Sequence, residues 1–269
     1  MTVQPYTQQQ LAAATYGMQA NGHQAGQTQE LLQGLCLLIQ GWAKAGKSSL
    51  ADTGPRPVLC MDVEQAAKWT PSRKIVWDPL RQTPPAWDGS WDTAVVHVKD
   101  FQTLEVTRQI LDRGQHPFNS ISVDSVPSIQ HRIEVARRGY NKMERDDWGV
   151  LLKQTTGIVW GFKDLLTHPT NRVWAVTYVC PTHWDYKRNK WRPYLHGQSG
   201  DVVPFVPDIE GWVYAADDGT HRMWTGPSKD YETGDRLWGR LPYDMQLGYP
   251  GMVQGWTVES MVQHVLATR

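Results

Sequence analysis

The side chains best placed to do chemistry lie between Gly41 and Leu50, where the sequence reads G-W-A-K-A-G-K-S-S-L. Two glycines, a lysine and a serine stand here in the spacing G-x-x-x-x-G-K-S, which is typical of loops that bind polyphosphates. Backbone N–H groups can surround the phosphates, the lysine can reach the β- and γ-phosphates, and the serine hydroxyl can bind Mg²⁺. The sequence therefore predicts a site for ATP and Mg²⁺, with nucleotide-binding residues Gly41, Trp42, Ala43, Lys44, Ala45, Gly46, Lys47, Ser48 and Ser49.

Carboxylates follow two apolar segments further along the chain. Asp62 and Glu64 come at the end of one segment, and Asp124 comes at the end of another. Because strand side chains alternate, Asp62 and Glu64 share one face near the edge where open α/β sheets bind ligands. Glu64 is placed to orient or deprotonate the water that attacks the γ-phosphate, and Asp124 is placed to hold Mg²⁺ together with Ser48. The alternatives are a solvated strand end for Asp62 and Glu64 and a turn former for Asp124.

These residues need a sheet that brings them together, and the apolar pattern supplies its strands. The predicted strands are Leu35–Ile39, Val58–Met61, Ile75–Trp77, Ala94–Val98, Ile121–Val123, Val173–Val179 and Gly211–Ala215. Helical spacing between them predicts helices over Phe101–Arg113 and Trp148–Leu166. Strands that alternate with amphipathic helices indicate an α/β fold, with a mostly parallel central sheet flanked by helices.

Composition sets the domain organisation and excludes some classes of protein. Residues 1–30 are rich in Gln, Ala and Gly and predict a weakly ordered arm or an adapter helix, followed by one domain over 31–269 with a loop-rich C-terminal portion. The 27 basic and 27 acidic residues balance, so any nucleic-acid contact must come from a local patch. Without a span of about 20 apolar residues or a signal-peptide pattern, we expect no membrane contact and a cytoplasmic location. Cys36, Cys60 and Cys180 lie in apolar runs and are expected to be buried free thiols.

One segment combines cations with aromatic rings, directly after the strand predicted over Val173–Val179. Cations neutralise backbone phosphates while aromatic faces stack on bases, which is how single strands are held without reading their sequence. The alternative is a hairpin whose aromatic side chains pack across the strands. The expected DNA-binding residues are Trp184, Tyr186, Lys187, Arg188, Lys190, Trp191 and Arg192, with Tyr194 beside them.

Several of these segments resemble the RecA-like recombinase core. After the phosphate loop, Val58–Glu64 reads V-L-C-M-D-V-E and Val123–Val126 reads V-D-S-V. In particular, the chain resembles short phage-encoded RecA-like ATPases that promote single-strand annealing and recombination. Shared features are Asp147-Trp148-Gly149 before a long helix, Thr182-His183 after a strand, and Gly197-Gln198, where Gln198 replaces the usual basic residue. The resemblance covers roughly residues 32 to 216.

The resemblance implies a RecA-like P-loop NTPase core with a peripheral β-hairpin. It implies that Glu64 is the catalytic base, that Asp124 is the Walker-B aspartate, and that Thr182 or His183 senses the γ-phosphate; the expected catalytic residues are Lys47, Glu64 and His183. A second basic stretch, His131 to Lys142, lies where this family has its first DNA loop, although it fits an exposed helix face equally well.

The function expected from this resemblance is a DNA-stimulated ATPase of the recombinase or annealing type. Its expected partners are single-stranded DNA, further copies of the chain in a filament or ring, and a single-strand-binding protein; its location would be the host cytoplasm if a phage encodes it. Two alternatives share the site. One is a motor ATPase such as a helicase or DNA-packaging enzyme, and the other is an annealing module that does not hydrolyse nucleotide but is switched by binding it.

Overall fold

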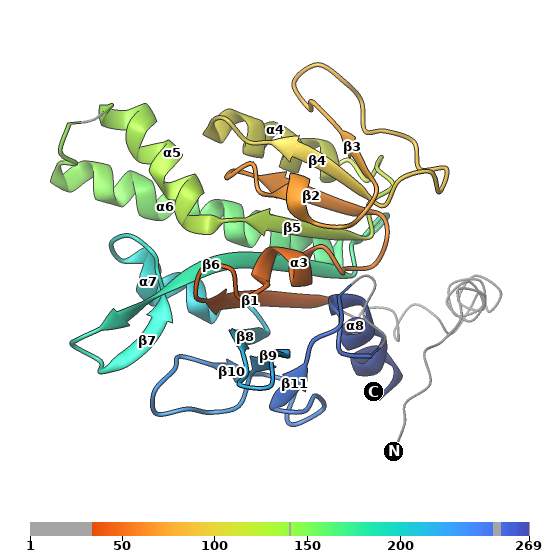
Figure 1. Ribbon diagram of the computed structural model, residues 1–269. Helices are drawn as coiled ribbons and strands as arrows, with labels where there is room; N and C mark the ends of the chain where they lie inside the picture. The colour runs from red at the N-terminus through yellow and green to blue at the C-terminus, as the bar shows by residue number, and fades with distance from the viewer. Residues whose placement is uncertain (1–33, 140, 250–253, 269) are drawn as a thin grey trace. The chain divides into compact units, whose positions relative to one another are not determined.

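The computed structural model describes residues 34–139, 141–249 and 254–268 (Figure 1). The N-terminal arm predicted over residues 1–30 lies outside the described residues. The described part is built on one mixed sheet of eleven strands. Its parallel strands are β1 (Leu35–Gly41), β2 (Val58–Asp62), β3 (Lys74–Val76), β4 (Thr93–His97), β5 (Ser120–Asp124), β6 (Ala175–Asp185) and β8 (Ile209–Ala215).

The parallel strands lie in the order β3-β4-β2-β5-β6-β1-β8, and the sheet continues through antiparallel β9 and β11. Two short strands pair outside this path: β10 with β8, and β7 with β6. Since β1, β2 and β5 are parallel, their carboxyl ends lie at one edge of the sheet, and each end carries a predicted site residue. The added strands are β7 (Lys190–Pro193), β9 (His221–Trp224), β10 (Gly234–Asp235) and β11 (Asp244–Gln246).

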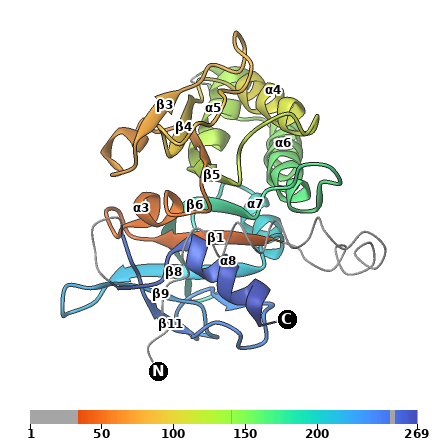
Figure 2. The same cartoon turned by 90° about the vertical axis from the view of Figure 1, so that its right-hand side faces the viewer.

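Helices cover both faces of the sheet, because alternate strand residues point to opposite sides. In β1, Cys36 and Leu38 belong to the core under α4, α5 and α6, while Leu35, Leu37 and Ile39 belong to the core under α3 and α8 (Figure 2). The helices are α3 (Lys47–Ala51), α4 (Phe101–Leu111), α5 (Val126–Arg138), α6 (Arg145–Asp164), α7 (Ser199–Val202) and α8 (Val258–Ala267), with 3-10 turns at Ala67–Trp69, Leu165–Thr167 and Val203–Phe205.

Polar side chains fix where the longer helices begin. The Asp100 carboxylate accepts a hydrogen bond from the Thr103 backbone N–H (2.8 Å) at the start of α4. Reciprocal capping boxes start α6, between Glu144 and Asp147, and α8, between Thr257 and Ser260. Each of these contacts satisfies N–H groups that the first helical turn leaves without an internal partner.

The α/β class and the seven predicted strands are confirmed, with boundaries shifted by a few residues. The largest shift is in β6, which continues to Asp185 into a segment expected to leave the sheet after Val179. The stretch from His131 to Arg138 is helical and belongs to α5, in agreement with the alternative of a helix face and not with that of a DNA loop. All three cysteines are free and buried, as predicted. No helix within the described ranges is long and apolar enough to cross a bilayer.

Candidate functional site

The phosphate-loop sequence joins the carboxyl end of β1 to the start of α3. Lys44 and Gly46 have positive φ angles of 63° and 96°, so the loop turns back before the helix begins. Gly46 is required there, because a Cβ atom would lie 2.2 Å from the Tyr249 hydroxyl. The Lys47 ammonium group donates hydrogen bonds to the carbonyl oxygens of Gly41 (3.0 Å) and Trp42 (2.6 Å). Burial lowers the pKa of Lys47, and the negative charge of Asp124 opposes that shift.

The next residue of the motif, Ser48, meets the predicted Walker-B aspartate. Asp124 ends β5 and is only 5% exposed, and the Ser48 hydroxyl lies close enough to its carboxylate to lower its pKa. Burial raises the pKa of Asp124 to about 6; Glu64 and Asp62 add to the rise, while Ser48 and Lys47 oppose it. The structure therefore brings together the two residues predicted to bind Mg²⁺, although they lie 76 positions apart in the sequence.

These two residues suit Mg²⁺, because the ion is usually held by one or two protein oxygen ligands together with water and substrate phosphates. No group of three or more His, Cys, Asp or Glu side chains that could hold a metal is present in the described part of the chain. The candidate site is therefore one that substrate oxygens would have to complete.

Glu64 lies at the same edge, two residues beyond β2, and its side chain is exposed. Its Oε1 atom accepts hydrogen bonds from the hydroxyls of Ser128 (2.7 Å) and Ser125. Ser125 directly follows Asp124, through a cis peptide bond, and Ser128 lies in the first turn of α5. Two hydroxyls on one neighbouring segment thus orient the carboxylate that the sequence predicts as the catalytic base.

Two residues near the phosphate loop were not predicted from the sequence. His221 at the start of β9 places Nδ1 2.9 Å from the Ala45 carbonyl oxygen, and its ring meets Tyr249 edge to face with 5.3 Å between centroids. The Tyr249 hydroxyl is buried with no hydrogen-bond partner in the described residues, and burial raises the pKa of Tyr249 to about 12. His221 lies 176 positions after Ala45. A local sequence pattern gives no signal for such a pairing.

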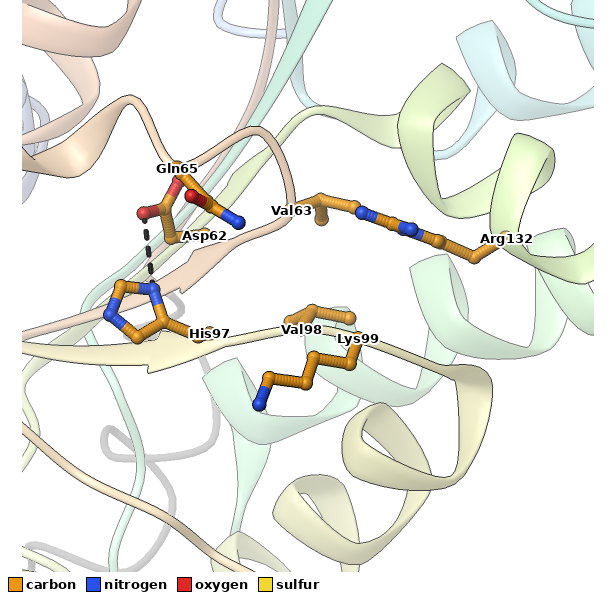
Figure 3. Close-up of a pocket in the computed structure, with 7 residues that line it drawn as sticks. All are labelled: Asp62, Val63, Gln65, His97, Val98, Lys99 and Arg132. Atoms are coloured by element: carbon orange, nitrogen blue, oxygen red, sulfur yellow. Dashed lines mark ion pairs between the residues drawn. The ribbon is translucent and has the colours of Figure 1, made fainter.

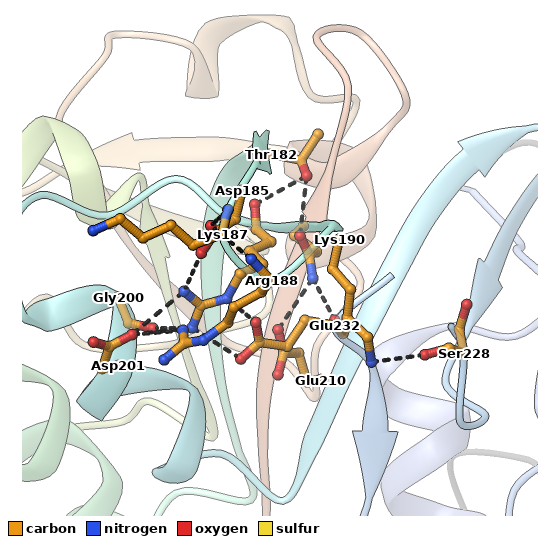
Figure 4. A network of polar contacts seen from close by, with 12 residues as sticks. Thr182, Asp185, Lys187, Arg188, Lys190, Gly200, Asp201, Glu210, Ser228 and Glu232 are labelled. Carbon is orange, nitrogen blue, oxygen red and sulfur yellow. Dashed lines mark hydrogen bonds and ion pairs between the residues drawn. The ribbon is translucent and has the colours of Figure 1, made fainter. Parts of the chain in front are cut away.

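A buried polar network connects the start of the phosphate loop to β6 and β8 (Figure 4). Gln40, directly before Gly41, is fully buried. Its amide nitrogen donates to Glu210 Oε1 (3.1 Å) and to the Glu232 carbonyl oxygen (2.5 Å), and its amide oxygen accepts from the Thr182 hydroxyl (3.1 Å). Of the two residues proposed to sense the γ-phosphate, Thr182 is therefore the one bonded to the residue beside the loop.

His183, the other candidate, makes a different set of contacts. Its ring meets Tyr194 edge to face at 5.4 Å, and its backbone pairs with Arg192 on β7. Its Nδ1 atom is buried and has no hydrogen-bond partner in the described ranges. This placement assigns His183 to the packing of the hairpin and gives no support to its predicted catalytic role.

The predicted DNA-binding segment forms an antiparallel hairpin of β6 and β7. Trp184 and Trp191 are cross-strand partners with ring centroids 5.3 Å apart, as the packing alternative expected. The cluster extends to the phosphate loop, because Trp42 lies 4.4 Å from Trp191 and 5.8 Å from Trp212 between ring centroids. Tyr186, near the hairpin tip, is 88% exposed and remains available for a ligand.

The basic residues of the hairpin have different surroundings. Arg192 is only 6% exposed and forms ion pairs with Glu232, Asp185 and Asp201, so its predicted role as a phosphate contact needs correction: its charge is already neutralised inside the protein. Arg188 pairs with Asp201 (2.6 Å), and the Lys190 ammonium group donates to the Ser228 carbonyl oxygen (3.0 Å).

Lys187 is the hairpin cation best placed for a ligand. Its side chain is exposed, extends away from the network in Figure 4, and forms no ion pair within the described residues. Together with the exposed ring of Tyr186, it places a cation and an aromatic face next to each other at the hairpin tip.

Two motifs that carry the resemblance lie against each other. Gly197 has a φ angle of 58°, in the left-handed region that favours glycine, and a Cβ atom there would lie 3.1 Å from the Trp148 ring. Asp147 caps α6 and forms ion pairs with Arg137 (3.0 Å) and Arg138 (2.5 Å). These two cations of the second basic stretch are therefore held by an internal carboxylate.

The carboxyl edge of β1, β2 and β5 combines a lysine, a serine beside a buried aspartate, and an oriented glutamate. This set can bind a polyphosphate with a divalent cation and activate a water molecule. No protein-family model matches the chain, and no curated protein shows significant similarity to it.

Proposed function

We propose that this chain is a RecA-like ATPase that binds single-stranded DNA and hydrolyses ATP with Mg²⁺. The observation that carries the proposal is the approach of Ser48 to the buried carboxylate of Asp124, with Lys47 and Glu64 at the same sheet edge. A glycine-rich turn that matched the motif by chance would have no reason to meet a buried strand-end aspartate. The parallel order of β1, β5 and β2 supports the same assignment.

In this proposal, Lys47 releases the carbonyl oxygens of Gly41 and Trp42 and binds the β- and γ-phosphates. Ser48 and Asp124 would hold Mg²⁺, which supplies charge neutralisation on the phosphate oxygens. Glu64 accepts a proton from the attacking water as the new P–O bond forms in line and the bond from the γ-phosphorus to the bridging oxygen breaks, leaving ADP and phosphate. Ser125 and Ser128 keep the carboxylate oriented during the transfer.

The DNA part of the proposal rests on the hairpin. Lys187 and Tyr186 at its tip offer a phosphate contact and a stacking surface, and Lys190 lies on the same hairpin. The Gln40–Thr182 hydrogen bond and the Trp42–Trp191 contact are two direct links between the hairpin and the phosphate loop. Binding of several copies along one strand, as a filament or ring, is part of the proposal.

One observation favours a second candidate, an annealing module for which ATP acts only as an assembly switch. Glu64 accepts two hydroxyl hydrogen bonds through the same oxygen atom, so an attacking water has to compete with Ser125 and Ser128 for that oxygen. Such a protein would assemble on DNA with nucleotide but show negligible turnover.

The rate of ATP hydrolysis with and without single-stranded DNA tests the proposal. We expect Mg²⁺-dependent hydrolysis that DNA stimulates several-fold. Nucleotide-dependent DNA binding without hydrolysis would favour the switch, and directional strand displacement in an unwinding assay would favour a motor. A protein that binds neither nucleotide nor DNA would overturn the proposal.

A further inference from the structure

A pocket of about 170 Å³ lies at the carboxyl edge of β2 and β4, beside α5 (Figure 3). Val63 and Val98, both nearly inaccessible to solvent, form its apolar wall. Lys47, Ser48, Glu64 and Asp124 of the proposed phosphate site do not line this pocket, and the Glu64 carboxylate is bonded to Ser125 and Ser128.

The pocket contains a buried acceptor without a donor. Asp62 is 1% exposed, and its Oδ1 atom accepts from the Ala66 backbone N–H (2.9 Å). Its Oδ2 atom has no hydrogen-bond partner in the described residues and lies 3.6 Å from Nδ1 of His97. A dashed line joins the two side chains in Figure 3. A buried carboxylate oxygen is rarely left without a donor, so its position suggests that a ligand supplies one.

Two cations frame the same pocket. Lys99 follows β4 on the His97 side, and Arg132 reaches from α5 toward Val63 (Figure 3). Both are exposed, and neither forms an ion pair with a carboxylate in the part of the chain that the structure describes. The pocket thus offers one buried hydrogen-bond acceptor and two cations, which together match a ligand with an N–H donor a few ångströms from an anionic group.

We propose that this pocket binds one nucleotide unit of single-stranded DNA, with the phosphate at Lys99 and Arg132 and an amino group of the base at Asp62. The inference rests on the proposed DNA-binding function and adds a second contact, apart from the hairpin. Its volume lies below the roughly 300–1,000 Å³ usual for small-molecule sites, which suits one unit of a polymer that continues outside. Adenine and cytosine present an exposed amino group, whereas thymine has its only N–H between two carbonyl oxygens that the carboxylate would repel.

The test measures binding of dC, dA and dT homopolymers as a function of salt. We expect the parent protein to bind dC and dA several-fold more tightly than dT. Lys99→Ala and Arg132→Ala should each flatten the plot of log affinity against log salt by up to about 0.7, the value for the one single-strand phosphate that the two cations share. Asp62→Asn keeps the shape of the side chain but can place a donor where Oδ2 was, so the preference for dC and dA should disappear or reverse.

The single variants Lys153→Ala and Arg113→Ala are the matched controls for Lys99→Ala and Arg132→Ala, because each removes one charge of the same type from an exposed position elsewhere on the surface. Hydrolysis without DNA should not change in the Lys99 and Arg132 variants, which also shows that they fold. If Lys99→Ala and Arg132→Ala match the controls in DNA affinity and salt dependence, the pocket proposal is wrong while the proposed function stands. If the parent binds no homopolymer, both fail.

Discussion

The indole of Trp42, inside the phosphate loop, meets the indole of Trp191 on the hairpin with 4.4 Å between ring centroids and an interplanar angle of 74°. Trp42 also provides the carbonyl oxygen that receives the Lys47 ammonium group at 2.6 Å. If nucleotide draws Lys47 away from this oxygen, the backbone that carries Trp42 loses a contact. The edge-to-face pair is therefore a direct contact through which nucleotide binding in the loop would affect the hairpin.

Trp42→Ala should separate nucleotide binding from the response to DNA. The lysine and serine of the loop stay in place, so ATP affinity should change by no more than about tenfold, since the lost aromatic contact contributes about 0.5–1.5 kcal/mol. DNA stimulation of hydrolysis should be largely lost. Trp69→Ala, which removes an 81% exposed indole elsewhere, is the control. Full DNA stimulation in Trp42→Ala would contradict a role for this contact in coupling.

Lys47→Ala tests the phosphate loop itself. The variant removes the ammonium group that donates to the Gly41 and Trp42 carbonyl oxygens, so ATP binding should weaken sharply and turnover should be abolished. Lys153→Ala, on the exposed side of α6, should behave like the parent. Turnover of Lys47→Ala within about threefold of the parent would refute the assignment, because such a group normally contributes orders of magnitude.

Glu64→Gln separates binding from chemistry. Glutamine retains an oxygen that can accept from Ser125 and Ser128, but it cannot take a proton from water. We expect ATP to bind as in the parent and hydrolysis to fall by about a hundredfold or more, as measured in single-turnover experiments. Ser128→Ala should give a smaller decrease, since one orienting hydroxyl remains. Preserved hydrolysis in Glu64→Gln would place the base elsewhere, with Asp62 as the next candidate.

The hairpin should show separable effects of charge, stacking and structure. Lys187→Ala should flatten the salt dependence of DNA binding by about 0.7, and Tyr186→Ala should weaken binding by about 1–3 kcal/mol with little change in that slope. Trp184→Ala and Trp191→Ala combine loss of any base stacking with loss of their own pair, so urea unfolding must accompany their binding curves. If Lys187→Ala and Tyr186→Ala bind DNA like the parent, the hairpin is structural.

Arg192→Ala should lower the stability of the protein, whereas the variants at Lys187 and Tyr186 should affect DNA binding. It leaves Glu232 and Asp185 without their cation inside the protein, so the free energy of unfolding should fall by more than about 2 kcal/mol. Equilibrium unfolding in urea measures this loss. A variant that unfolds like the parent but binds DNA weakly would restore Arg192 to the candidate DNA contacts.

The buried His116 should make the folded protein less stable in acid. Burial, assisted by nearby His168, lowers the pKa of His116 to about 4, and its Nδ1 atom accepts the Phe118 backbone N–H (3.2 Å). Above about pH 6.5 the ring is neutral in both the folded and unfolded states. As the pH falls toward 4 the unfolded chain gains a proton that the folded protein does not, so stability is lost, on the order of 1–2 kcal/mol after solvent screening.

Urea unfolding of the parent and of His116→Asn at pH 7.5 and 4.5 checks this effect. The amide oxygen of asparagine can replace Nδ1 as the acceptor but does not titrate, so the parent should lose more stability than the variant between the two pH values. Equal losses would show that His116 is not the group responsible.

The sequence predicted best those candidate site residues that directly follow an apolar strand. The motif from Gly41 to Ser48 and the carboxylates Glu64 and Asp124 could be predicted because each follows an apolar strand, and parallel strands end at one edge. The α/β class followed from the same alternation of strands and helices. The hairpin was also foreseen as an alternative, because aromatic and charged residues alternate along it.

Contacts between distant segments could not be predicted in this way. Whether Arg192 faces DNA or an internal carboxylate depends on Glu232, 40 positions later, which no local pattern connects to it. The same holds for Tyr249, whose hydroxyl lies against Gly46. The helix α8 was missed as well, since its residues follow a stretch rich in Gly, Pro and Trp that indicates loops.

The contact between α8 and the segment after α3 has a consequence for how the protein is made. The Val258 backbone N–H donates to the Thr53 hydroxyl (2.9 Å) and that of Glu259 donates to the Thr53 carbonyl oxygen (3.1 Å), across 205 positions in the first case. α3 also buries Leu50 and Ala51 in the core that α8 shares. On the ribosome, Thr53, just after α3, leaves the exit tunnel 205 positions before the residue of α8 that bonds to it, so the supporting helix gains this packing only after residue 258 has emerged. A nascent chain therefore carries the nucleotide motif through the synthesis of the intervening residues before the site around it is complete.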